Sequence, residues 1–218
     1  MAPIASPGSM VPVSARLVLF DIDGTLIRTG GAGVRAFRRA AALLHGTEVG
    51  ETAGNLRFHG RTDGSLVSEL LRSHGRPDTS AERERFLETY AFLLDEELHR
   101  HHGDTCPGAA ELVSALAEHP DHPVIGLLTG NIRLGAALKL AAHGLGREFV
   151  VGAFGDDHLD RNELAKIALR RGSEHVGCRL SGDDVVVIGD TRADIECARA
   201  IDAPCIAVAT GAESLSEL

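Results

Sequence analysis

Two aspartates lie two residues apart in the segment Asp21-Ile22-Asp23-Gly24-Thr25. In an extended chain, side chains two positions apart point to the same side, so both carboxylates are expected to face one pocket. Neighbouring carboxylates can differ in protonation, one acting as an ionised nucleophile and the other as a general acid. The alternative is a capped turn, in which the aspartates only accept backbone N–H bonds.

Two further polar groups offer matching chemistry. The hydroxyl of Thr129 and the turn N–H groups at Gly130 and Asn131 can hold phosphoryl oxygens, although Thr or Asn there can equally serve as a helix N-cap. Asp190 and Asp194 are four residues apart and can bind a hard cation such as Mg²⁺. Asp194 would bind it directly or through water, or would only stabilise a helix N-terminus.

All three segments follow short apolar runs, Leu17 to Phe20, Val124 to Leu128 and Val185 to Ile188. Such runs are typical of buried parallel strands, and a fourth is expected at residues 204–208. Apolar residues at helical spacing predict helices at residues 108–118, 132–143, 163–171 and 192–201. Alternating strands and helices predict an α/β fold, a doubly wound parallel sheet that binds ligands at the carboxyl ends of its strands.

Residues 29–105 differ, because they contain helical patterns at 35–46, 63–75 and 82–103 and no convincing strand. We therefore predict a core made of residues 15–28 and 106–218, a helical cap domain at 29–105 and a flexible tail at 1–14. In the cap, the segment from Phe58 to Asp63 either reaches the active site, where Arg61 would contact an anionic substrate, or begins a helix capped by Thr62 or Asp63.

The composition limits the class of protein. A formal net charge of -9 argues against nonspecific binding to nucleic acid or to an anionic membrane. The four cysteines lack zinc or disulfide spacing, and no signal peptide or membrane span is evident, so the cytoplasm is the expected location. We expect a monomer or homodimer.

Together, the segments FDIDGTL, LLTGN and VVIGDTRADIECA resemble the haloacid dehalogenase superfamily, in its phosphoglycolate phosphatase-like branch with a small helical cap. The resemblance covers the chain from Arg16 onward. It implies that Asp21 attacks phosphorus to form an aspartyl-phosphate and that Asp23 protonates the leaving oxygen and then activates water. It also implies Mg²⁺ held by Asp21, the backbone carbonyl of Asp23 and Asp190, with Thr129 binding the transferring phosphoryl group of a small phosphorylated metabolite.

The chain departs from the family in one respect. Members usually carry a basic residue before the last motif, most often Lys followed by Pro, and no Lys-Pro pair occurs here. Arg161 stands at the comparable place and is expected to supply the cation, with Lys166 as the alternative. Three functions remain open: a phosphomonoesterase, a phosphosugar mutase of the same fold, and a binding or regulatory protein that has lost catalysis. Asp23 disfavours a dehalogenase.

Overall fold

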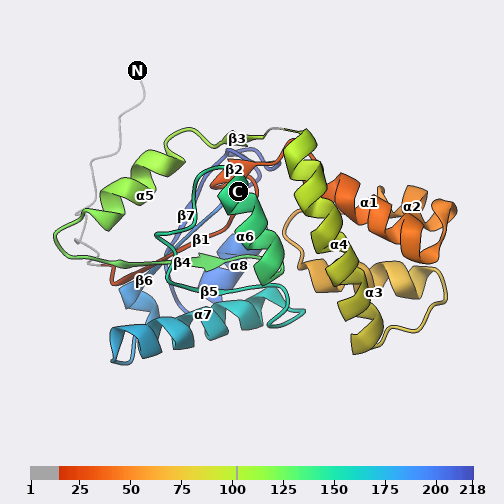
Figure 1. Ribbon diagram of the computed structural model, residues 1–218. Helices are drawn as coiled ribbons and strands as arrows, with labels where there is room; N and C mark the ends of the chain where they lie inside the picture. Colours follow the sequence, from red (N-terminus) through yellow and green to blue (C-terminus); the bar gives the residue numbers. More distant parts are fainter. Residues whose placement is uncertain (1–14, 102) are drawn as a thin grey trace, which may run out of the picture.

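The computed structural model describes residues 15–101 and 103–218, so the predicted tail at 1–14 lies outside the described part. Its centre is a five-stranded parallel sheet in the order β5-β4-β1-β6-β7 (Figure 1). The strands are β1 (Leu17–Phe20), β4 (Val124–Leu128), β5 (Val151–Ala153), β6 (Val185–Gly189) and β7 (Cys205–Ala207). This is the predicted α/β fold.

Side chains alternate across β1, so that each face of the sheet builds its own core. Leu17 and Leu19 pack with α7 (Arg161–Val176) and α8 (Arg192–Arg199). Val18 and Phe20 pack with α5 (Ala109–Ala117) and α6 (Arg133–Ala142). A short 3₁₀ helix, Gly182–Asp184, precedes β6. Because helices cover both faces, the strands are apolar throughout, as their sequences indicate.

A separate apolar cluster lies among four helices at one end of the molecule, on the right in Figure 1. The helices are α1 (Ala32–His45), α2 (Thr47–Ala53), α3 (Asp63–Ser73) and α4 (Ser80–Arg100). A two-stranded antiparallel ribbon, β2 (Ile27–Arg28) and β3 (Asp104–Thr105), joins them to the sheet. The cap boundaries at 28/29 and 105/106 stay a prediction, and this ribbon lies beside them.

Five elements were not anticipated, namely α2, β2, β3, β5 and the 3₁₀ helix before β6. Helix α2 lacks an apolar stripe, and it packs so closely on α1 that a Cβ at Gly50 would lie 2.7 Å from Ala42 Cβ. Strand β5 is only three residues long, and β3 is a two-residue strand within the segment expected to be purely helical. Short elements of this kind are fixed by their partners rather than by their own sequence pattern.

Candidate active site

Asp21 and Asp23 leave the carboxyl end of β1, and both line the same cavity, as their spacing predicts. The Asp21 side chain is nearly buried, at 7% exposed, whereas that of Asp23 is 41% exposed. Gly24 follows with a φ of 88°, a left-handed conformation that lets the chain turn away from the pocket. A Cβ at Gly24 would collide with the Asp190 carboxylate, so this glycine also allows the β1 and β6 ends to approach.

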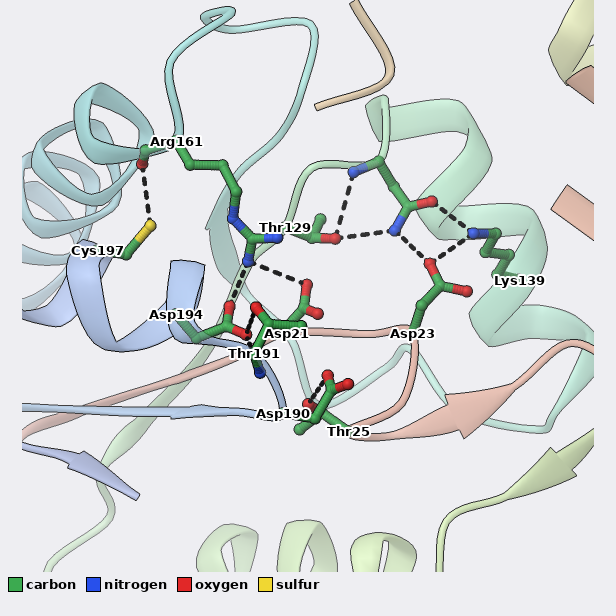
Figure 2. Close-up of polar contacts among 11 residues, drawn as sticks. Asp21, Asp23, Thr25, Thr129, Lys139, Arg161, Asp190, Thr191, Asp194 and Cys197 are labelled. Atoms are coloured by element: carbon green, nitrogen blue, oxygen red, sulfur yellow. Dashed lines mark hydrogen bonds and ion pairs between the residues drawn. The ribbon is translucent and has the colours of Figure 1, made fainter. Parts of the chain in front are cut away.

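The cation beside Asp21 is Arg161, the first residue of α7. Its guanidinium Nη2 lies 3.5 Å from Asp21 Oδ1 and also bonds Asp194 (Figure 2). Burial by itself lowers the pKa of Arg161, but the carboxylates of Asp194 and Asp21 outweigh burial and raise that pKa, so the group stays charged. A buried cation at a helix N-terminus opposes the helix dipole, so its position is explained by the carboxylates rather than by α7.

Three buried carboxylates gather at this point. Asp21, Asp190 and Asp194 each offer an oxygen within 4.8 Å of the others. Burial, reinforced by Asp194, raises the pKa of Asp21 well above its usual value, and Arg161 only partly opposes this. The pKa of Asp190 is raised to about 6, again by burial first and by Asp194 second. The single positive charge of Arg161 cannot neutralise three carboxylates, so the cluster keeps an excess of negative charge in a low-dielectric site.

The residues fit a divalent cation. Asp190 Oδ1 accepts a bond of 3.0 Å from the Thr25 hydroxyl, whereas its buried Oδ2 has no partner among the described residues. An unpaired buried carboxylate oxygen is costly unless a cation or a ligand satisfies it. Oxygen ligands of this type are those that Mg²⁺ prefers.

Asp194 is placed differently from Asp190. Its Oδ2 accepts bonds from the N–H (3.0 Å) and the hydroxyl (2.6 Å) of Thr191, which makes it the third residue of a capping box on α8. Its Oδ1 accepts from Arg161. Since both oxygens are already engaged, Asp194 stabilises the helix start and orients Arg161, while Asp21 and Asp190 keep free oxygens for a metal.

A second network surrounds Asp23. The buried Thr129 hydroxyl accepts from the Asn131 side-chain amide at 2.9 Å, and that amide also donates to Asp23 Oδ2 at 2.8 Å. Neither Thr129 nor Asn131 caps α6, because Ile132 holds the N-cap position without a side-chain bond. The capping alternative for these two residues is therefore wrong, and their side chains face the cavity instead.

Lys139 was not among the residues predicted from the sequence. Its side chain is 5% exposed, and Nζ donates to Asp23 Oδ2 and to Asn131 Oδ1, both at 2.6 Å. Burial alone would raise the pKa of Asp23, but Lys139 outweighs it and lowers that pKa. A signal was present, because Lys139 lies on the buried face of α6 with Gly135 and Ala136, where helical spacing calls for an apolar residue.

The cap loop at residues 58–63 reaches the core. Thr62 caps α3 by accepting from Ser65 N, which confirms the expected helix start. The loop also borders the cavity, while a contact of Arg61 with a substrate stays a prediction. Asp63 N donates to Gly130 O at 2.8 Å, and Asp63 Oδ2 accepts from Ile132 N at 2.9 Å. The loop therefore lies directly on the turn after β4.

Two predicted substrate contacts have other partners. Arg61 lines the cavity, and its guanidinium pairs with Glu69 of α3 at 2.9 Å. Lys166 does not reach the site: its side chain is 55% exposed and pairs with Glu163 at 2.6 Å. Lys166 as the alternative cation is therefore corrected, because five residues beyond Arg161, about 1.4 helical turns, its side chain points to the surface of α7.

The cavity has a volume of about 430 Å³ and lies where cap and core meet. Core residues from the ends of β1, β4 and β6 form its floor, and residues of α1, α3 and α4 with the 58–61 loop form its roof. The residues for which we propose chemistry here are Asp21, Asp23, Thr129, Gly130, Asn131, Lys139, Arg161 and Asp190. Carboxylates, a hydroxyl, the turn after β4 and two buried cations thus line one cavity, which is the setting expected of a candidate active site.

Residues 18–199 match the family model described as haloacid dehalogenase-like hydrolase. The chain belongs to this family. Within it, the chain is 28% identical over 207 residues to a phosphoglycolate phosphatase of Mesorhizobium japonicum, covering 91% of this chain and 85% of that protein.

Solved structures of similar fold cover almost the whole chain. CbbY from Rhodobacter sphaeroides in complex with phosphate has a TM-score of 0.71 at 18% identity, over 94% of this chain and 90% of that one. A hydrolase from Pseudomonas syringae has a TM-score of 0.66 at 23% identity, over 94% and 89%. No helix in the described ranges is long and apolar enough to cross a membrane.

Proposed function

We propose that this member of the haloacid dehalogenase-like hydrolase family is a Mg²⁺-dependent phosphomonoesterase acting on a small organic phosphate. The observation that carries the proposal is the setting of Asp21. This buried carboxylate borders the cavity, has Arg161 Nη2 at 3.5 Å, and lies with Asp190 in a carboxylate cluster that could hold a metal ion. The similarity to a phosphoglycolate phosphatase supports the same reaction type.

The chemistry assigned to the chain has two displacements. Asp21 attacks phosphorus, the P–O bond to the leaving group breaks, and Asp23 gives that oxygen a proton. Asp23 then takes a proton from water as the water oxygen attacks phosphorus, and the bond to Asp21 breaks to release inorganic phosphate. In the free protein Asp23 is ionised beside Lys139, so it must gain its proton as the substrate binds.

The donors around the cavity fit the transferring phosphoryl group. Thr129, the turn at Gly130 and Arg161 all line the cavity that Asp21 borders. Arg161 offsets repulsion between the attacking carboxylate and the phosphate. Asn131 and Lys139, both residues of the core, hold Asp23 in place. Arg61 is retained as a residue that approaches the substrate once its pair with Glu69 opens.

Asp21, the Asp23 carbonyl and Asp190 are the proposed metal ligands, and Asp194 supports them from outside. When bound, Mg²⁺ would supply positive charge that neutralises both the carboxylate and the phosphate. It would also keep Asp21 ionised despite the burial that raises its pKa.

A phosphate-release screen with sugar phosphates, phosphoglycolate, nucleotides and amino-acid phosphates tests the proposal. Asp21→Asn should lose turnover by at least 10³-fold, roughly, because an amide cannot attack phosphorus, while its circular dichroism and melting temperature match a folded protein. Lys166→Ala is the matched surface control. An isomerised product without phosphate release would indicate a mutase, and no turnover of any compound by the wild type would indicate a binding protein.

A further inference from the structure

Between α1, α4 and α6 the cavity extends to a corner that the proposed chemistry does not use. Gly33 in the first turn of α1 faces Tyr90 of α4 and Lys139 of α6. A Cβ built on Gly33 would lie 3.5 Å from the Tyr90 hydroxyl and 3.6 Å from Lys139 Nζ. Both polar atoms therefore border the small space above the bare Cα of Gly33.

The Tyr90 hydroxyl is the unexplained group in this corner. The residue as a whole is 2% exposed and lines the cavity, and its hydroxyl makes no hydrogen bond within residues 15–101 and 103–218. The hydroxyl oxygen is not among the fully buried unpaired atoms, so it opens on the cavity, where a phenol buried at its ring can bind a polar ligand. Burial, followed by the charges of Asp63 and Asp23, raises the pKa of Tyr90 well above its usual value, so the hydroxyl remains a donor.

Other donors point to the same place. Helix α1 begins at Ala32 after the N-cap Gly31, without a side-chain cap and without an acidic residue in its first turn. Ala32 N donates to Thr29 O, whereas the N–H groups of Gly33 and Val34 have no partner within the described residues. Lys139 has three donors, and Asp23 and Asn131 account for two of them. Lys139 also connects this corner to Asp23, the residue that would protonate the leaving group.

We propose that Gly33, Tyr90 and Lys139 form a leaving-group subsite, in which the Tyr90 hydroxyl donates to an acceptor oxygen of the substrate close to the scissile bond. The inference rests on the proposed phosphatase function and deepens it. It makes Tyr90 a specificity-determining residue that selects alcohols or acids of few carbons over plain alkyl groups. Gly33 is required because any side chain there would occupy the position of the ligand oxygen.

The composition of the chain permits a direct test. Tyr90 is the single tyrosine, and the chain has no tryptophan. Tyrosine labelled with ¹³C at Cζ therefore gives one resonance that reports on this hydroxyl. The experiment uses the Asp21→Asn variant with Mg²⁺, because this variant does not turn over the compounds. It is titrated to saturation with ethyl phosphate, 2-hydroxyethyl phosphate and 2-phosphoglycolate, which differ only at the terminal carbon of a two-carbon leaving group.

The proposal expects the Cζ resonance to move with one or both oxygen-bearing compounds and to stay in place with ethyl phosphate. The compound that moves it tells whether a hydroxyl or a carboxylate is bound. Gly33→Ala should remove the response, and its alanine meets only ordinary van der Waals contacts at 3.5 and 3.6 Å, so the helix folds. Equal shifts with all three compounds, or no shift with any, would overturn the subsite.

Steady-state kinetics separate this inference from the proposed function. Tyr90→Phe should lower kcat/KM for the compound that moves the resonance by about 3- to 10-fold, the value of one neutral hydrogen bond, and leave ethyl phosphate unchanged. A uniform loss on all substrates would make Tyr90 a structural residue only. If the wild type releases phosphate from none of these probes and from no compound of the wider screen, the phosphatase proposal fails, while the resonance still decides whether Tyr90 binds the oxygen.

Discussion

Replacing Arg161 tests the electrostatic design of the site. At 3.5 Å and an effective dielectric constant of about 20, its attraction to Asp21 alone is about 5 kcal/mol, and Asp194 is bound as well. Arg161→Gln keeps a planar donor but leaves the buried carboxylates uncompensated. Removing one partner of a buried ion pair typically costs about 3–5 kcal/mol of the free energy of unfolding.

The Arg161→Gln variant can be tested by two measurements, its stability and its turnover. Urea unfolding of Arg161→Gln without Mg²⁺ should show a loss of about 3–5 kcal/mol, and added Mg²⁺ should restore more stability than it adds to the wild type. Turnover should fall roughly 10²- to 10³-fold, because a fixed charge that stabilises the transition state is absent. Arg161→Lys should recover part of the stability, because an ammonium group keeps the positive charge but lacks the planar guanidinium with its several donors.

Lys166→Ala is the matched control, because Lys166 lies on the same helix but pairs only with Glu163 at the surface. It should change stability by less than about 1 kcal/mol and leave kcat/KM unchanged. Wild-type turnover by Arg161→Gln, or a collapse confined to Lys166→Ala, would refute the assignment of Arg161 as the active-site cation.

Three further predictions follow from the site. Activity should disappear in excess chelator and return with Mg²⁺ but poorly with Ca²⁺, which a metal titration of phosphate release checks. Lys139→Met should lower kcat roughly 10- to 100-fold by freeing Asp23, with a shifted pH–rate profile as the readout that a purely structural role would not produce. Burial raises the pKa of Asp63 to about 6, above its unfolded value, so the free energy of unfolding of the wild type should decrease as the pH rises from about 4 to 6. In urea unfolding, Asp63→Asn should be more stable than the wild type by up to about 3 kcal/mol at pH 8 and equally stable at pH 4.

The sequence alone was enough to predict the sheet strands that end at the site. Continuous apolar runs ending in polar residues predict β1, β4 and β6 because a parallel sheet covered on both faces needs apolar residues throughout. The carboxyl ends of such strands meet at one edge, so the convergence of Asp21, Thr129 and Asp190 follows from topology. Arg161 was found by its place before the last motif, and the structure puts it beside Asp21.

Other features depend on partners that are distant in sequence. Lys139 lies 116 residues from Asp23, and only the packing of α6 at the end of β1 brings the two together. The choice between Arg161 and Lys166 turned on which side of α7 faces the sheet. The role of Asp194 in a capping box depended on the bonds of Thr191.

The corner of the cavity at Gly33 likewise could not be predicted from the sequence alone. The sequence identifies a glycine, a tyrosine and a lysine in three separate helical patterns, with nothing to connect them. Tertiary packing places them around one space, because α4 lies against both α1 and α6. Local pattern determines which face of an element is apolar, whereas the partner of each polar group on that face depends on how the elements pack.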